Sequence, residues 1–256
     1  MRISAIIITY NEAQNIARCL SALKPVADEI IVVDSFSKDD TVAIAEGLGA
    51  IVKHHAFSGY GEQKLVALNM AQHDWILSVD ADEILSAELQ QSINATKENP
   101  KHDAYEINIL ANYCGKWIRH GGWYPQPKIR FFNKNAGFMK TDKVHEGWEM
   151  NPGTSIGKLS GDLLHYSFPT ISSHLKKIEQ YSEIGARFDL ERGKKVSLIK
   201  LWFGPKWTYF TIYIIRGGFL DGYYGWVFAK NSAFASFAKY LKIRQYTAMK
   251  ARGELF

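Results

Sequence analysis

The sequence has few of the features that mark secreted, zinc-stabilised or membrane-spanning proteins. Its 256 residues include only two cysteines, Cys19 and Cys114, with no Cys-x-x-Cys spacing and no neighbouring histidine cluster. This argues against a disulfide framework and a structural zinc site, and favours a reducing compartment. No run of about eighteen apolar residues occurs, so we expect no membrane-spanning helix. We also expect no signal peptide, because no cleavage site follows the first apolar residues.

Glycine-rich phosphate-binding loops are also absent. No Gly-x-Gly-x-x-Gly fingerprint follows the apolar segment at residues 3–9, and the chain contains no Walker A sequence. These absences argue against hydride transfer and against an NTPase. If a nucleotide binds, carboxylates and a metal ion must hold it instead of such a loop.

Acidic residues are scarce in the last quarter of the chain. From Arg192 onward, twelve Lys or Arg residues are opposed only by Asp221 and Glu254, which gives this segment a charge of +10. The preceding residues carry −5. A basic, aromatic segment on a mildly acidic body predicts a polyanionic surface as a partner.

One part of this basic segment has the pattern of an amphipathic helix. Its apolar residues fall on one helical face, and its lysines could reach lipid headgroups. The alternative is a helix that packs into the core and leaves its lysines in solvent. The apolar residues are Ala233, Phe234, Phe237 and Leu241, and the lysines are Lys230, Lys239 and Lys242.

The first hundred residues alternate between strand patterns and helical patterns. Strands are predicted at residues 3–9, 29–33, 50–53 and 74–79, and helices at 15–24, from 39 or 40 to 49, 61–72 and 87–97. Such alternation predicts a parallel sheet with helices on both faces. Ligands of such sheets bind at the carboxyl ends of the strands, where residues 9–12, Asp34 and residues 80–82 fall. Further strands are predicted at 128–132 and 158–166, and a polar helix at 170–192.

Two carboxylates follow the fourth predicted strand at alternate positions. In an extended chain Asp80 and Asp82 point to the same side, where they repel each other unless a cation or ligand lies between them. A hard divalent ion that bridges carboxylate and phosphate oxygens would fit there. The alternative is a solvated turn in which Asp82 or Ser86 caps the next helix.

Several motifs, in this order along the chain, resemble those of the family 2 glycosyltransferases of the GT-A fold. They are IITYNE at residues 7–12, IVVDS at 31–35, QK at 63–64 and DAD at 80–82. Further motifs resemble the lipopolysaccharide-core β-1,4-glucosyltransferases that act on heptose. These are GWYP at 122–125, KIRFF at 128–132, VHE at 144–146 and GGFLDG at 217–222. One position departs from that pattern, since Gln126 follows Pro125 where related sequences often have aspartate.

The resemblance covers nearly the whole chain and implies its domain organisation. It implies an α/β fold of the GT-A type, a Rossmann-like nucleotide-diphospho-sugar transferase, with a mostly helical, basic and aromatic C-terminal extension. We expect a catalytic domain at residues 1–195, with a nucleotide-sugar half at 1–100 and an acceptor half at 101–195. We expect a membrane- or acceptor-associated extension at 196–256.

The resemblance also implies residue roles. The donor-binding set is Thr9, Tyr10, Glu12, Asp34, Lys64, Asp80, Ala81 and Asp82. The acceptor-binding set is Gly122, Trp123, Tyr124 and His145. Asp82 would be the chief ligand of a divalent Mg²⁺ or Mn²⁺ ion, with His165 completing the coordination. Glu146 would be the catalytic base.

Elementary chemistry allows these roles. A divalent ion held by Asp82 can neutralise the departing diphosphate, and an imidazole ligand favours manganese more than oxygen ligands alone would. A carboxylate opposite the leaving group can take the proton of the incoming hydroxyl, and one such displacement inverts the anomeric centre. Each role also has a structural alternative. Glu146 could pair with Lys143 on the surface, His165 could be a core histidine, and Lys64 could be a solvated helix lysine.

We therefore expect an inverting, metal-dependent hexosyltransferase. Its donor would be a UDP-sugar, with glucose favoured, and its acceptor a heptose of the lipopolysaccharide inner core, the lipid A-Kdo-heptose. It would be cytoplasmic and peripheral on the inner face of the bacterial inner membrane. Two alternatives remain open. The same fold could act on a polyprenyl phosphate or a peptide cysteine, or the basic segment could form a nucleic-acid-binding module. We expect no nucleic-acid partner, because the positive charge lies in one C-terminal block.

Overall fold

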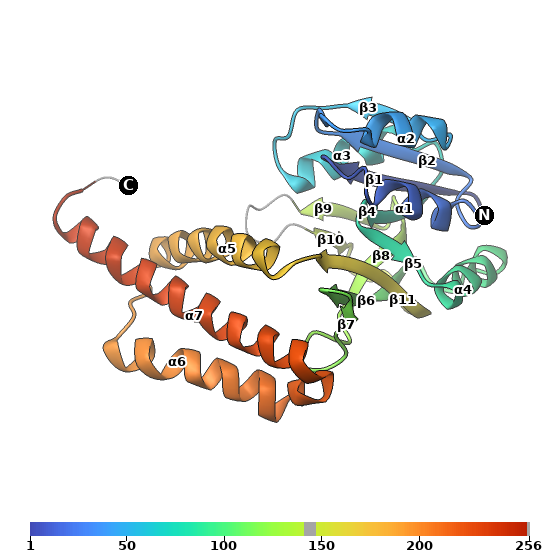
Figure 1. The fold of residues 1–256 in the computed structure, drawn as a ribbon. Coiled ribbons are helices and arrows are strands. Elements are labelled where there is room, and N and C mark those ends of the chain that lie inside the picture. Colours follow the sequence, from blue (N-terminus) through green and yellow to red (C-terminus); the bar gives the residue numbers. More distant parts are fainter. Residues whose placement is uncertain (141–146, 255–256) are drawn as a thin grey trace. The chain divides into compact units, whose positions relative to one another are not determined.

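The computed structural model describes residues 1–140 and 147–254 (Figure 1). The chain packs as two compact units. Unit 1 comprises Met1–Leu110 and Gln126–Tyr166, and unit 2 comprises Ala111–Pro125 and Ser167–Phe256. These units are defined by how the chain packs. They do not test the predicted functional boundary at residue 195, which stays a prediction.

Unit 1 begins with the predicted parallel sheet. Its strands lie in the order β3-β2-β1-β4, and every neighbouring pair is parallel. The register sets Thr9 opposite Asp34 and Ile8 opposite Asp80, so the three strand ends share one edge. The strands are β1 (Ile3–Thr9), β2 (Glu29–Asp34), β3 (Ile51–His54) and β4 (Trp75–Asp80).

Helices cover both faces of this sheet because its apolar side chains alternate. Ile3 and Ile7 of β1 share one core with Leu20 of α1 (Ile16–Leu23), whereas Ile6 belongs to another core with Ala67 of α3 (Tyr60–Met70). The remaining helices of this segment are α2 (Thr41–Gly47) and α4 (Ala87–Glu98). The predicted α/β class is therefore confirmed.

The second half of unit 1 extends the sheet with strands of mixed direction. β8 (Pro127–Asn133) pairs with β4, and the order continues through β6 (Ala104–Tyr113), β11 (Ile156–Phe168) and β5 (Glu83–Leu85). A separate two-stranded antiparallel sheet contains β9 (Gly137–Lys140) and β10 (Gly147–Met150). The ends of β6 and β11 belong to unit 2, where β6 pairs with β7 (Lys116–Trp117).

Unit 2 is mostly helical. Its elements are α5 (Ile171–Glu191), α6 (Leu198–Phe210), a π-helical turn η1 (Thr211–Ile215), a 3₁₀ turn η2 (Gly218–Asp221) and α7 (Gly222–Ala251). Thr170 and Ser173 form the capping box that starts α5. Ala186 of α5 shares a buried core with Ile243 and Tyr246 of α7. Within residues 1–140 and 147–254, every helix falls short of the length and apolarity that a bilayer-spanning segment needs.

Candidate active site

The loops after β1 and β2 are tied together at the sheet edge. The backbone N–H of Asn11 donates to Ser37 Oγ at 2.8 Å, and Lys38 N donates to Asn11 Oδ1 at 2.8 Å. Asn11 and Phe36 both have positive φ, of 54° and 61°, which non-glycine residues adopt only at some cost. Two strained turns held by reciprocal hydrogen bonds give this edge a fixed shape.

Asp34 lies at the end of β2 and is completely buried. Its carboxylate accepts hydrogen bonds from the backbone N–H of Ser37 at 2.9 Å and from the Ser37 hydroxyl. His54 Nδ1 lies 3.2 Å from Asp34 Oδ2. The carboxylate therefore orders its own loop, and its predicted position near a nucleoside base stays a prediction.

Asp80 lies between two cations. Lys64 Nζ is 2.8 Å from its Oδ1, and Arg130 donates to its Oδ2 at 3.0 Å. Arg130 also donates to Glu83 Oε1 at 2.7 Å, and Glu83 Oε2 accepts from the backbone N–H of Asp80 at 2.8 Å. Lys64 is therefore paired with the predicted site and is not a solvated helix lysine.

Electrostatics keep Asp80 and Arg130 charged. Burial would raise the pKa of Asp80, but the positive charges of Lys64 and Arg130 outweigh burial and hold that pKa well below its usual range. Burial would lower the pKa of Arg130, yet the charges of Glu83 and Asp80 raise it. Burial raises the pKa of Glu83 above its ordinary value. Asp80 and Arg130 thus form a permanent ion pair at neutral pH.

Arg130 and Glu83 are absent from the predicted site. Arg130 lies in the strand segment KIRFF, where one cation stands among apolar residues. Charged side chains are almost never fully buried without a partner. An arginine that interrupts an apolar strand therefore indicates a buried ion pair. That signal could have identified Arg130. Its two carboxylate partners come from β4 and β5, which sequence spacing alone does not reveal.

Asp82 and His165 meet on unit 1, as the resemblance implied. His165 Nε2 lies 3.1 Å from Asp82 Oδ2, and both side chains remain partly exposed, at 27% and 22%. The pairing of β11 with β5 sets His165 opposite Glu83, and Tyr166 N donates to the carbonyl of Asp82 at 3.0 Å. Burial lowers the pKa of His165, but the hydrogen bond and charge of Asp82 outweigh it and raise that pKa.

The donor atoms of this pair fit a divalent ion that shares its coordination with a substrate. No three His, Cys, Asp or Glu side chains converge on a metal position within the described part of the chain. Asp82 and His165 offer one oxygen and one nitrogen, and Mg²⁺ and Mn²⁺ commonly take their other ligands from water and phosphate oxygens. Asp80 is less suited to this role because two cations already neutralise it.

Four further residues of the predicted donor-binding set lie on the same edge of unit 1. The Thr9 hydroxyl is buried and has no hydrogen-bond partner among the described residues, so a bound ligand could use it. Tyr10 is 53% exposed. Glu12 Oε2 accepts from Asn15 Nδ2 at 2.5 Å, and the side chain of Ala81 is buried.

The predicted base Glu146 and its neighbour His145 lie outside the described residues, as does Lys143. Their roles stay predictions. Ser86, and not Asp82, caps α4, because Ser86 Oγ accepts from Leu89 N at 3.2 Å. This leaves the Asp82 carboxylate available to His165 and to a metal ion.

The remaining acceptor residues lie in unit 2. Gly122 has a φ of +82°, and a Cβ there would lie 2.5 Å from Arg216 Nη1, so a side chain would strain the backbone and require Arg216 to move. The Trp123 ring is parallel to that of Phe168, with centroids 5.6 Å apart, and lies 3.9 Å from Phe228. Arg119 lies over Tyr124 at 5.5 Å.

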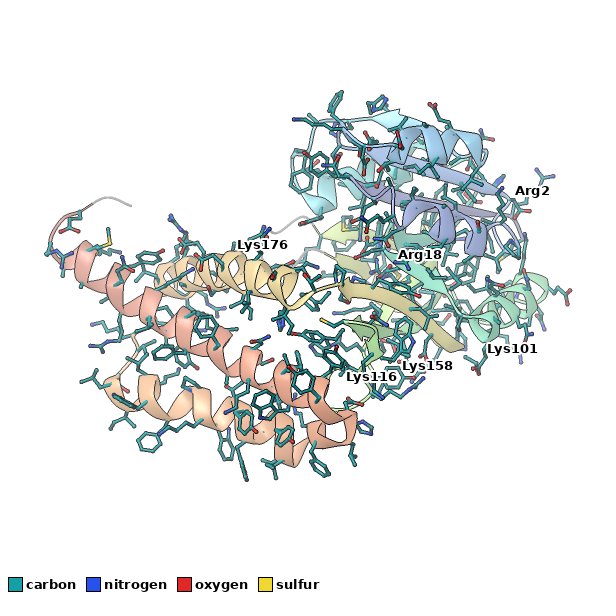
Figure 2. The ribbon with its side chains drawn as sticks, in the orientation of Figure 1. Arg2, Arg18, Lys101, Lys116, Lys158 and Lys176 are labelled. Atoms are coloured by element: carbon teal, nitrogen blue, oxygen red, sulfur yellow. The ribbon has the colours of Figure 1, made fainter. Side chains whose placement is uncertain are left out.

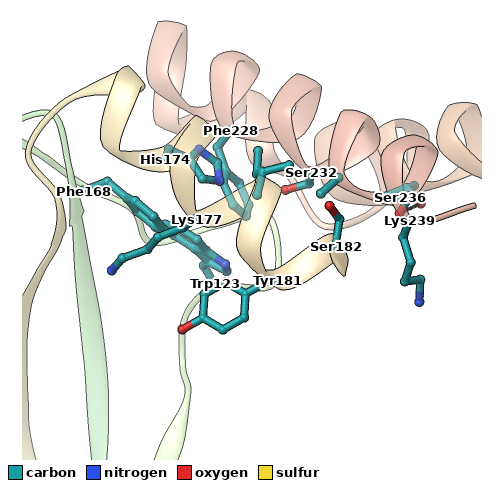
Figure 3. Close-up of a pocket in the computed structure, with 13 residues that line it drawn as sticks. Trp123, Phe168, His174, Lys177, Tyr181, Ser182, Phe228, Ser232, Ser236 and Lys239 are labelled. Carbon is teal, nitrogen blue, oxygen red and sulfur yellow. Dashed lines mark hydrogen bonds between the residues drawn. The ribbon is translucent and has the colours of Figure 1, made fainter. Parts of the chain in front are cut away.

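Trp123 also lines a cavity of about 450 Å³ within unit 2 (Figure 3). One wall is aromatic, formed by Trp123, Phe168 and Phe228, with Lys177 lying against the Phe168 ring, and the other carries hydroxyl groups and Lys239. The polar lining residues are Ser182, Thr208, Ser232, Ser236, Lys177 and Lys239. An aromatic wall opposite hydroxyl groups suits a ligand with both an apolar face and polar edges.

His174 borders this cavity and belongs to a polar triad whose other members are Tyr113, which is buried, and Asn231, which is partly buried. Tyr113 Oη lies 3.0 Å from His174 Nδ1, and Asn231 Nδ2 donates to Tyr113 Oη at 3.0 Å. Burial lowers the pKa of His174 to about 4, with a contribution from the charge of Lys177. His174 is therefore a neutral packing residue at physiological pH.

Comparisons with known proteins agree on one family. Residues 4–155 match the model of Glycosyl transferase family 2. An uncharacterised glycosyltransferase of Rickettsia felis is 38% identical over 255 residues, which cover 95% of this chain and 90% of the relative. The lipopolysaccharide core biosynthesis glycosyltransferase LpsC of Rhizobium meliloti is 28% identical, covering 98% of this chain and 94% of its own length.

A match among solved structures covers the full length of this chain. Residues 1–349 of TarS from S. aureus are 16% identical, with a TM-score of 0.48, and the match covers 100% of this chain and 93% of that one.

Proposed function

The chain belongs to glycosyltransferase family 2, and on that premise we propose that it transfers a hexose from a UDP-sugar to a heptose of the lipopolysaccharide inner core. Family membership makes the chain an enzyme of the transferase class. Two finer parts of the proposal, glucose as the sugar and heptose as its acceptor, rest on motifs 122–125, 128–132, 144–146 and 217–222. A full-length relative named for lipopolysaccharide core biosynthesis supports the acceptor class. Such an acceptor would place the enzyme at the inner face of the inner membrane.

One observation carries the donor side of the proposal. Asp82 and His165 offer an oxygen and a nitrogen 3.1 Å apart, on partly exposed side chains next to Asp80. A Mg²⁺ or Mn²⁺ ion bound there would neutralise charge on the leaving diphosphate. The Asp82 carboxylate and the neutral form of His165 would hold the ion.

The neighbouring residues orient and screen the donor. Arg130 fixes Asp80 in its ionised form, so this carboxylate can accept hydrogen bonds from ribose hydroxyls. Lys64 pairs with Asp80 and can turn toward a diphosphate oxygen when the donor binds. The buried Thr9 hydroxyl supplies a further hydrogen bond to the nucleoside.

On the acceptor side we assign the proton transfer to Glu146. Its carboxylate would take the proton of the acceptor hydroxyl, and attack opposite the leaving group would invert the anomeric centre. Trp123 would contact the acceptor through the cavity of unit 2, where a sugar ring can stack on an aromatic face while its hydroxyls meet Ser232 and Ser236.

Release of UDP measured for a panel of UDP-sugars, each with Mn²⁺ or Mg²⁺, tests the donor. Turnover should require a divalent ion and should be fastest with UDP-glucose. Adding lipopolysaccharide truncated at the inner-core heptose should stimulate release. A polyprenyl phosphate or a cysteine-containing peptide that stimulates release equally well would contradict the proposed acceptor while leaving the donor assignment intact.

A further inference from the structure

The helix α6 exposes large apolar side chains instead of burying them. None of its residues is buried, and Ile199, Trp202 and Trp207 are 74%, 67% and 63% exposed. Figure 2 shows ring-bearing side chains that project from α6 on the side away from α7. We call the exposed set the α6 face. It consists of Leu198, Ile199, Trp202, Phe203, Trp207 and Phe210.

The opposite side of α6 is the one that packs within unit 2. Thr208 Oγ1 lies 3.2 Å from Ser236 Oγ of α7, and a Cβ on Gly204 would lie 2.7 Å from the Tyr240 ring. The helix therefore turns its small and polar residues toward α7 and its large aromatic residues outward. This reverses the arrangement of an ordinary surface helix, and an exposed patch of this kind marks an interaction site.

The charge around the α6 face selects the partner. No acidic residue occurs from residue 192 to residue 220, whereas Lys200 and Lys206 lie on α6 and are exposed. Lys206 Nζ lies 5.7 Å from the Phe203 ring. Tryptophans flanked by lysines are typical of segments that lie at the boundary between acyl chains and anionic headgroups.

The length of α6 decides how it meets a bilayer. Its 13 residues extend for about 20 Å, which is shorter than the hydrocarbon core. We propose that the α6 face inserts into the headgroup–acyl boundary of a bilayer that contains anionic lipids, with the helix parallel to the membrane plane. This surface differs from the one predicted on α7. There, Lys239 and Lys242 pair with Asp189 and Glu179 of α5.

Binding through the α6 face gives the proposed membrane location a contact surface. It rests on the proposed function only for which membrane the protein meets. Binding to vesicles requires no sugar transfer, so the two ideas fail separately. An enzyme that releases UDP but ignores vesicles would contradict the inference alone. A protein that binds vesicles but never releases UDP would contradict the proposed function alone.

The test is sedimentation of the full chain with vesicles of phosphatidylcholine containing phosphatidylglycerol. We expect Phe203→Ser to weaken partitioning about tenfold, because it removes one buried aromatic side chain from the bound state. Phe57→Ser is the matched control, since Phe57 lies in unit 1 and is 56% exposed, compared with 64% for Phe203. The control should partition like the parent protein, and vesicles of phosphatidylcholine alone should bind both proteins less tightly.

Fluorescence gives a second readout that does not depend on affinity. Acyl chains brominated near the headgroup should quench tryptophan emission of the parent protein. A double variant with Trp202→Phe and Trp207→Phe should lose that quenching but should still sediment with vesicles. Equal partitioning of Phe203→Ser and Phe57→Ser would overturn the inference. So would a parent protein that forms a dimer which Phe203→Ser dissociates, because the α6 face would then bind a second copy of the chain.

Discussion

Asp82 and His165 are 83 positions apart in the chain, yet His165 Nε2 lies 3.1 Å from Asp82 Oδ2. The contact exists because β5 and β11 pair at the edge of the sheet. It joins a strand-end carboxylate to an imidazole, which is the ligand combination that we propose for the divalent ion.

Loss of the imidazole should weaken metal binding. We expect His165→Ala to raise the Mn²⁺ concentration for half-maximal UDP release at least about tenfold, the loss typical of a disturbed metal site. His102→Ala is the control, because His102 is an exposed histidine of the same unit. An unchanged Mn²⁺ requirement in His165→Ala would remove His165 from the metal site.

Removal of the Arg130 cation should destabilise unit 1. Arg130→Met leaves the carboxylates of Asp80 and Glu83 close together without their shared cation, and such a loss typically costs about 3–5 kcal/mol of unfolding free energy. Urea denaturation measures the change. Adding Glu83→Gln should restore part of the lost stability, because Asp80 keeps its pairing with Lys64 whereas Glu83 loses its ion pair with Arg130. A double variant no more stable than Arg130→Met would contradict the proposed pairing.

A side chain at Gly122 should displace Arg216, and shortening Arg216 should relieve that cost. Gly122→Ala adds a Cβ that clashes with Arg216 at a left-handed backbone position. Gly115→Ala is the matched control, because it has a φ of +89° with nothing within 4 Å, and it should cost only the backbone strain of about 1–2 kcal/mol. Gly122→Ala should cost clearly more in thermal denaturation, and Arg216→Ala should remove the excess. Equal costs at the two glycines would contradict the clash.

Protonation of His174 should make stability fall in acid. Its pKa is about 4 in the folded chain, compared with 6.5 for an ordinary histidine, so the unfolded chain binds more protons between these values. The stability should therefore be intact above pH 6.5 and decrease as the pH falls toward 4, by roughly 2 kcal/mol after solvent screening.

The comparison of His174→Gln with the parent protein isolates this effect from that of the carboxylates. The difference in unfolding free energy between the two proteins should change across that pH interval. A difference that stays constant with pH would show that His174 titrates normally in the folded chain.

The parallel half of unit 1 was predictable because its signals are local. Each strand is a short apolar run and each helix repeats its apolar residues at helical spacing, so residues such as Ile7, Leu20 and Asp80 fall where the pattern predicts. Parallel strands also bring their carboxyl ends to one edge whatever their order, which is why Asp34 and Asp80 were predicted to share it.

The remaining features depend on pairings that no local pattern specifies. The order β4-β8-β6-β11-β5 depends on long-range register, and it alone brings Arg130 to Asp80 and His165 to Asp82. Similarly, the sequence showed that Lys239 and Lys242 lie on one helix but not that α5 supplies acidic partners. The position of His165 was reached only through resemblance to a family.

The central claim is that Asp82 holds the metal ion for sugar transfer, and one measurement tests it most directly. UDP release from UDP-glucose with Mn²⁺ and a heptose-terminated acceptor is compared for the parent protein, Asp82→Ala and the control Asp74→Ala, whose carboxylate is 64% exposed and pairs with Lys134. We predict that Asp82→Ala unfolds at the parent temperature and releases no UDP above background, while Asp74→Ala keeps the parent rate. Metal-dependent release by Asp82→Ala at the parent rate would contradict the claim.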